Sequence, residues 1–189
     1  MSRAYRISVK ESVHRVIKAE DSVCTQLEVL EVLPPEQMAG LLADELEKRG
    51  FKKAGERLVR TEDGVTISID PRAMTVTVTA EGRERATAEA SREGWAADDY
   101  GPHEGKVREE LKKELQKELE KKLQDKKAEL QGQVTDRLEG KLSDLRQELD
   151  QVVNRVTAEA LKRKAAQLGQ IKEMTEDPQA GSLTIVLEV

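Results

Sequence analysis

Aromatic residues are scarce in this sequence of 189 residues, where Phe, Trp and Tyr together make up 2%. A compact enzyme of this size needs more aromatic bulk to build the walls of an active site, so this scarcity argues against a catalytic domain. Charged residues, in contrast, make up 37% of the chain. This composition is typical of a long helix or coiled coil joined to a small folded domain.

Cysteine and histidine are also rare, with a single cysteine, Cys24, and two histidines, His14 and His103. One cysteine cannot form an intramolecular disulfide, and we predict that Cys24 is a small buried residue on a strand. Neither histidine has a Cys, Asp or Glu at the spacing of a metal site, and His103 is expected to lie exposed in a loop. We therefore predict no catalytic residues, no metal and no cofactor.

Long apolar runs are absent, since no stretch approaches the ~18 residues that a membrane span requires. The first residues also lack the apolar core of a signal peptide, so we expect a soluble protein of the cytoplasm with no membrane partner. The net charge is -5, and the short basic patches are interleaved with acidic residues and lack aromatic neighbours. Nucleic acid is therefore not an expected partner, and no glycine-rich phosphate loop is present.

The most informative feature that is present is a charged segment from Glu104 to Leu168, which follows Pro102 and precedes Gly169. Leu or Val recurs in it mostly every four residues, and the alternation of three and four that a left-handed coiled coil needs begins only after Leu142. An apolar stripe of this kind needs a cover, and we predict that it joins copies of the chain into an elongated homo-oligomer. The predicted self-association stripe consists of Leu138, Leu142, Leu145, Leu149, Val152 and Val156.

Two arrangements of this helix are open. A continuous helix of about 65 residues would span ~98 Å and place the end of the chain far from its first strands. A helix that folds back near Gly132 would instead let the last strands join the N-terminal sheet. A lone glycine within a helix costs only ~1 kcal/mol, and we favour the continuous helix.

The first 80 residues predict a small α+β sheet domain. Alternation predicts strands over 4–9 and 23–32, while 12–19 fits either a helical turn or a strand. Proline at the start and Gly50 at the end predict a packing helix over 35–50. A short strand over 56–61 and a β-hairpin around the turn 70–73 complete this domain.

Residues 81–103 are acidic and Ala-rich, and we interpret them as a mobile linker in which 84–92 could form a short helix. Trp95 in this segment packs on the folded domain, which is the favoured interpretation, or anchors a partner. Residues 169–189 predict a C-terminal β-hairpin, in which Leu183, Ile185 and Leu187 face a core. The expected fold is therefore α+β, with an N-terminal sheet domain, a long charged helix and this hairpin.

Two stretches of the chain resemble a known family. The first is the opening Met1-Ser2-Arg3-Ala4-Tyr5-Arg6-Ile7-Ser8-Val9-Lys10-Glu11-Ser12, followed by Gln26-Leu27-Glu28-Val29-Leu30 and Leu33-Pro34-Pro35-Glu36. The second is Leu161-Lys162-Arg163-Lys164-Ala165-Ala166-Gln167-Leu168-Gly169, followed by Ile171-Lys172-Glu173-Met174 and Gly181-Ser182-Leu183-Thr184-Ile185. Together they are similar to the small accessory components of bacterial ternary systems that pair an FtsH-like or MoxR-like AAA+ ATPase with a von Willebrand A-domain protein. The resemblance covers roughly half of the chain and implies these two partners, but it implies no catalytic residues.

Two hypotheses follow. The first is a non-enzymatic adaptor or scaffold that self-associates and couples to an AAA+ ATPase system, in bacterial conflict or protein quality control. The second is a small-ligand or peptide-binding module that uses the sheet domain or an exposed edge strand, such as 182–189.

Overall fold

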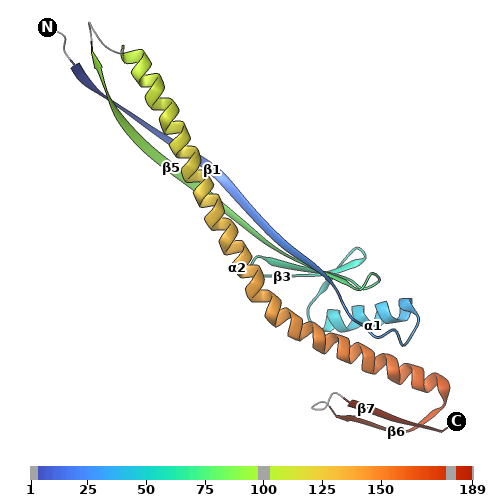
Figure 1. Cartoon of the computed structure of the whole chain (residues 1–189). Helices are drawn as coiled ribbons and strands as arrows, with labels where there is room; N and C mark the ends of the chain where they lie inside the picture. The colour runs from blue at the N-terminus through green and yellow to red at the C-terminus, as the bar shows by residue number, and fades with distance from the viewer. Residues whose placement is uncertain (1–3, 98–102, 178–181, 189) are drawn as a thin grey trace. The chain divides into compact units, whose positions relative to one another are not determined.

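The computed structural model describes residues 4–97, 103–177 and 182–188, and its α+β architecture confirms the predicted fold class (Figure 1). The elements in chain order are β1 (Ala4–Gln26), α1 (Pro35–Lys48), β2 (Lys52–Ala54), β3 (Arg57–Glu62), β4 (Val65–Asp70), β5 (Thr75–Ala97), α2 (Glu104–Leu168), β6 (Gln170–Asp177) and β7 (Ser182–Glu188). A five-stranded sheet has the strand order β1-β5-β4-β3-β2, and β6 and β7 form a separate two-stranded sheet.

The chain divides into two compact units. Unit 1 consists of residues 1–20 and 81–134, and unit 2 consists of residues 21–80 and 135–189. The strands β1 and β5 and the helix α2 each contribute to both units. The prediction of a continuous helix is confirmed, because α2 runs without interruption from Glu104 to Leu168. The alternative of a helix that folds back near Gly132 is wrong.

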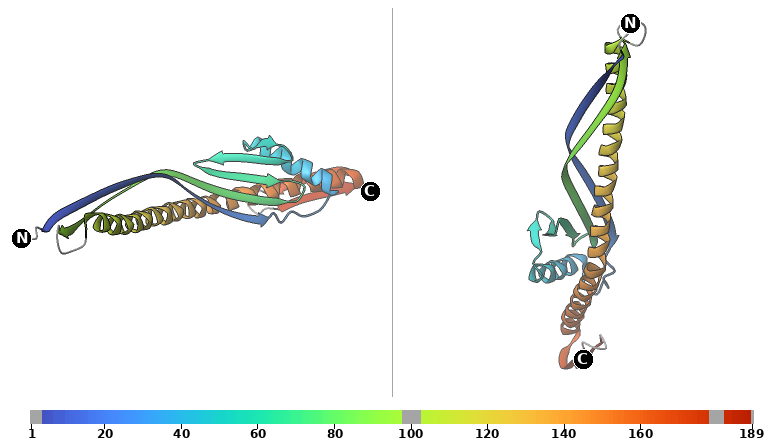
Figure 2. Two further views of the ribbon diagram at one scale, coloured as in Figure 1. Left: turned by 90° about the horizontal axis from the view of Figure 1, so that it is seen from above. Right: turned by 90° about the vertical axis from the view of Figure 1, so that its left-hand side faces the viewer.

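Unit 1 is a two-stranded β-ribbon that twists beside the first part of α2 (Figure 2). The side of β5 that faces the helix carries mostly glycine and alanine at alternate positions: Gly82, Ala86, Ala88, Ala90, Gly94 and Ala96. These small residues let the leucines of α2 approach the strand closely. A Cβ atom at Gly82 would lie only 2.6 Å from Cγ2 of Val134, and one at Gly94 would lie 2.9 Å from Cγ1 of Val107.

Side chains of α2 also protect the outer edges of this ribbon. Lys122 Nζ donates to the carbonyl oxygen of Glu89 at 2.9 Å, and Lys126 Nζ donates to that of Thr87 at 2.8 Å. On the other strand, Gln131 Nε2 donates to the carbonyl oxygen of Glu20 at 3.1 Å. Lysine at a strand edge discourages pairing with foreign strands, so this part of the ribbon is shielded.

The predicted linker over 81–103 is therefore wrong for residues 81–97, which form the second half of β5. The prediction for 98–102 lies outside the described residues. The missed signal was the alternation of small residues, which have too little apolar surface to be recognised as the buried face of a strand. The segment 12–19 is likewise strand and not helix, because β1 is continuous from Ala4 to Gln26.

Unit 2 contains the main core. Its sheet face of alternating Val and Ile residues packs beneath α1, and Leu42, Leu46, Val65, Ile69 and Val76 are fully buried there. The predicted hairpin is confirmed, with Ile67 opposite Val78 and Ile69 opposite Val76 in β4 and β5. The helix predicted over 35–50 is observed as α1, and Gly50, whose φ is 87°, follows its end.

Two details of unit 2 differ from the predictions. The strand expected over 23–32 ends at Gln26, because the chain must leave the sheet to reach Pro35. The short strand β2 after α1 was not predicted, since its three residues show no periodicity. The C-terminal hairpin is confirmed as β6 and β7, with Met174 opposite Ile185.

Candidate functional site

The predicted self-association stripe is covered within the chain itself. In unit 2, Leu142 is half-buried and the other five stripe residues are buried: Leu138, Leu145, Leu149, Val152 and Val156. The apolar stripe therefore does not need a second copy of α2 as its cover, which removes the reason for predicting a seam between helices. Self-association by another surface stays a prediction.

One stretch of this stripe is only partly covered and borders a groove in unit 2. The groove has a volume of about 800 Å³ and lies between the end of β1 and the middle of α2. Buried side chains form its floor, among them Val76, Val78 and Leu145. Val23, which is 39% exposed, and the half-buried Leu142 form part of its rim. The groove therefore has an apolar floor and a lining that also carries polar and charged side chains, among them Gln26, Glu28 and Arg146.

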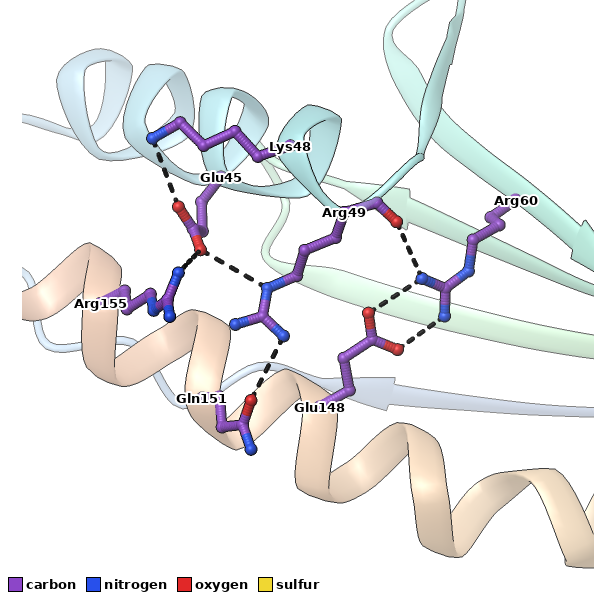
Figure 3. Close-up of polar contacts among 7 residues, drawn as sticks. All are labelled: Glu45, Lys48, Arg49, Arg60, Glu148, Gln151 and Arg155. Carbon is purple, nitrogen blue, oxygen red and sulfur yellow. Dashed lines mark hydrogen bonds and ion pairs between the residues drawn. The ribbon is translucent and has the colours of Figure 1, made fainter. Parts of the chain in front are cut away.

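Beside this groove, an ionic cluster holds α2 against α1 and β3 in unit 2 (Figure 3). Arg60 of β3 makes two hydrogen bonds to the Glu148 carboxylate, Nη1 to Oε1 at 2.9 Å and Nη2 to Oε2 at 2.6 Å. Its guanidinium also lies 4.4 Å from the centre of the Phe51 ring, a cation–π contact. The hydrogen bond from Arg60 lowers the pKa of Glu148, and the same bond raises the pKa of Arg60.

The second half of the cluster surrounds Glu45, which is only 7% exposed. Its carboxylate pairs with Arg155 of α2 at 3.3 Å and with Arg49 at 3.5 Å, and it also pairs with Lys48 at 3.4 Å. Three cations around one buried carboxylate compensate the cost of removing it from water. The Nε atom of Arg60 is buried and has no aligned hydrogen-bond acceptor, although it lies 3.1 Å from Oε1 of Glu62. The cluster therefore contributes to the packing of unit 2.

Trp95 lies in unit 1 on the face of β5 that points away from α2, and it is 63% exposed. Its neighbours Gly94 and Ala96 face the helix, so the backbone on either side of it is held in place. An ion pair between Arg6 and Glu93, 2.9 Å apart, lies on the same ribbon. The favoured interpretation, in which Trp95 packs on the folded domain, is wrong, and its alternative as a partner anchor stays open.

The remaining candidate residues are dispersed. The His14 ring lies 3.0 Å from Oγ1 of Thr87 in unit 1, and His103 is exposed next to the start of α2. Cys24 is on a strand as predicted, but it is exposed and not buried, because the sheet face that it shares with Thr77 carries no helix among the described residues. No group of His, Cys, Asp or Glu in the described part of the chain could hold a metal ion.

No helix among the described residues has the length and apolar character needed to cross a membrane.

Comparison with curated proteins and with solved structures gave no match. A family model, FtsH ternary system domain X5, matches residues 1–189. The similarity seen at the two ends of the sequence thus extends over the full length, and the chain belongs to the family of the FtsH ternary system domain X5.

Proposed function

We propose that this component of an FtsH ternary system is a non-catalytic adaptor that self-associates and binds its FtsH-like AAA+ ATPase through Trp95. The observation that carries the proposal is the exposure of this side chain, 63%, in a chain that has one tryptophan. Tryptophan is enriched among the residues that dominate binding energy at protein interfaces. A large apolar side chain held outward in this way has little role in the stability of unit 1.

The surroundings of Trp95 support a binding role. Gly94 and Ala96 lie under α2, and the contact of Gly94 with Val107 and Leu111 leaves no room for a larger residue. The strand therefore presents Trp95 from a fixed backbone, which reduces the entropy that would be lost when a partner binds. The von Willebrand A-domain protein of such a system is a second proposed partner of this surface.

Intrinsic fluorescence tests this proposal directly, because Trp95 is the single tryptophan of the chain. If a partner ATPase without tryptophan near its interface covers Trp95, the emission shifts to shorter wavelength and becomes resistant to acrylamide quenching. Trp95→Ala should weaken binding by at least about tenfold, which corresponds to ~1.4 kcal/mol. Val16→Ala, which removes the other exposed large apolar side chain of the ribbon, is the matched control. Equal affinities of the wild type and Trp95→Ala would contradict the proposal.

The absence of catalysis is a separate part of this proposal. The purified chain alone should not turn over ATP, esters, peptides or nucleic acids, with or without a chelator. The reason is that the His14–Thr87 and Thr77–Cys24 contacts are isolated, exposed pairs, and neither has a third described group that would orient a nucleophile and its base. Robust turnover that is lost on substitution of His14, His103 or Cys24 would refute it.

A second candidate function is a peptide-binding module, and the groove in unit 2 favours it. The groove lies beside the edge strand β1, and strand addition at such an edge is a common way to bind an extended segment. Its apolar floor would take alternate side chains of that segment. The two functions are compatible, because Trp95 belongs to unit 1 and the groove to unit 2.

A further inference from the structure

We infer that strand β7 of one copy of this chain adds to the open edge of β1 in a second copy and fills the groove of unit 2. The inference rests on the self-association proposed above and specifies the contact that produces it. Three observations support it: the hairpin lacks a cover, the groove lacks a strand, and the hairpin of the same chain is too short to fill the groove.

The hairpin of β6 and β7 exposes an apolar face. None of its described side chains is buried, although Met174 and Ile185 lie opposite each other and Leu183 continues the same face. The opposite face is mostly polar, with Thr175 opposite Thr184 and Glu173 opposite the exposed Val186. A two-stranded hairpin is marginally stable by itself in water, so a hairpin with an uncovered apolar face needs a third layer or further strands.

This arrangement also corrects the sequence prediction for the C-terminal strand. Leu183 and Ile185 were expected to face a core, but both are only half-buried, and the side chain of Leu187 lies outside the described residues. Their alternation is nevertheless the pattern of a strand with one buried face. The pattern is accounted for if the burial occurs in an assembly of chains.

The groove, in turn, lacks a strand along the edge of β1. β1 is the edge strand of its sheet, and the amide of Leu27 donates to the carbonyl oxygen of Met74 in the turn that leads into β5, at 2.7 Å. Because backbone groups alternate in direction along a strand, those of Cys24 and Gln26 point toward the open edge. Next to that edge, Leu142 and Val153 of α2 remain half-buried.

An added strand would satisfy both sides of this groove at once. Its backbone would pair with the edge of β1, and its alternate apolar side chains would lie on the exposed part of α2. Leu183 and Ile185 have the required spacing of two residues, with Thr184 between them directed to the other side. The described part of the chain therefore contains both an open strand edge with an apolar floor and a strand able to occupy it.

The reach of the hairpin indicates that it comes from a second copy. β6 and β7 contain 8 and 7 residues, so the hairpin is about 26 Å long at ~3.3 Å per residue. That length corresponds to about 17 residues of helix at ~1.5 Å per residue. A hairpin folded back from Leu168 would thus reach only to about residue 151. It would not reach the half-buried Leu142, so the end of the groove at that residue would stay open.

Size-exclusion chromatography with light scattering on the full chain tests the inference. The wild type should be oligomeric, and Ile185→Asp should raise the dissociation constant at least about tenfold, because a carboxylate would enter the apolar groove. Thr184→Asp is the matched control, with the same charge one residue away on the polar face of the same strand. A groove variant, Leu142→Asp, should weaken assembly as Ile185→Asp does, and thermal unfolding identifies any variant that fails to fold.

Mixing the two variants provides the decisive measurement. A chain with Leu142→Asp keeps its hairpin, and a chain with Ile185→Asp keeps its groove, so the mixture should form heterodimers through one intact contact. The inference is wrong if Ile185→Asp and Thr184→Asp assemble equally, and also if the mixture does not recover assembly. It is likewise wrong if Ile185→Asp leaves assembly unchanged but lowers Tm, since the hairpin would then pack on its own chain.

These outcomes also separate the inference from the proposed function. A monomeric wild type at all concentrations would refute both self-association and this contact. An oligomer that is insensitive to Ile185→Asp would retain self-association but refute the contact. Binding of the ATPase through Trp95 is measured independently, because Trp95 belongs to unit 1.

Discussion

Arg60 of β3 and Glu148 of α2 form an ion pair with two hydrogen bonds, of 2.9 Å and 2.6 Å, between residues 88 positions apart in the chain. Both side chains are well shielded, with 16% and 25% of their surface exposed. This contact joins the long helix to the sheet of unit 2, although neither residue belongs to an apolar pattern in the sequence. The Arg60–Glu148 ion pair therefore forms only when the chain folds, and the sequence pattern does not predict it.

Glu148→Gln should destabilise unit 2 in a pH-dependent way. Because the hydrogen bond from Arg60 lowers the pKa of Glu148 below its unfolded value of about 4.3, the contribution is present above that pH and lost as the pH falls through the folded-state pKa. The substitution should lower the free energy of unfolding by about 1–3 kcal/mol at pH 7. Denaturant unfolding at pH 7 and pH 3 measures the difference, which should shrink at the lower pH.

A suitable control for this substitution is Glu118→Gln on the same helix. Glu118 pairs with Arg92 and Lys122 at 3.0 Å, but these side chains are more exposed. Solvent screens such pairs, so the control should change stability far less. Equal effects of the two substitutions would show that the Arg60–Glu148 pair contributes no more to the free energy of unfolding than the exposed pairs of Glu118.

Gly82→Leu should destabilise unit 1. A side chain at this position would collide with Val134, since the Cβ atom alone would lie 2.6 Å from Cγ2 of Val134. Overpacking of this kind costs about 1–3 kcal/mol. Circular dichroism during thermal unfolding should show a lower Tm, and an unchanged Tm would indicate that β5 does not lie against α2 at Gly82.

Gly132→Ala should have the opposite effect. Gly132 lies within α2, and nothing lies within 4 Å of the position that its Cβ atom would occupy. Alanine favours helix over glycine by about 0.8–1 kcal/mol, so the variant should be more stable by up to this amount. A decrease in Tm would instead support a break in the helix at this residue.

Leu145→Asp combined with Leu149→Asp should unfold unit 2 and not merely dissociate an oligomer. Both leucines are buried within the single chain, and burying unpaired carboxylates there costs several kcal/mol. Near-complete loss of cooperative unfolding is the expected result. A folded monomer with the wild-type Tm would restore the original interpretation of this stripe as a seam between chains.

The sequence by itself determined those parts of the fold that depend on local periodicity. The recurrence of Leu and Val over 65 residues, about 18 helical turns, predicts helix over 104–168, and the Asp70-Pro71 turn between alternating residues predicts a hairpin. The resemblance of the two ends of the chain also identified the family, which the match over 1–189 confirmed. Long elements with a strong periodic pattern can be predicted from the sequence, because the requirement for apolar residues on one face is repeated many times along them.

The tertiary structure decided what covers each apolar surface. A stripe of leucines indicates that it must be buried, but not whether a second helix or the chain's own sheet buries it, because the hydrophobic effect is not directional. Residues 81–97 were mistaken for a linker, since Gly82 and Gly94 contribute to packing by being small and not by being apolar. Trp95 is exposed because the residues on either side of it, Gly94 and Ala96, occupy the face of β5 under α2. Which face of a strand meets a helix is a consequence of packing between distant segments, and a local pattern does not contain it.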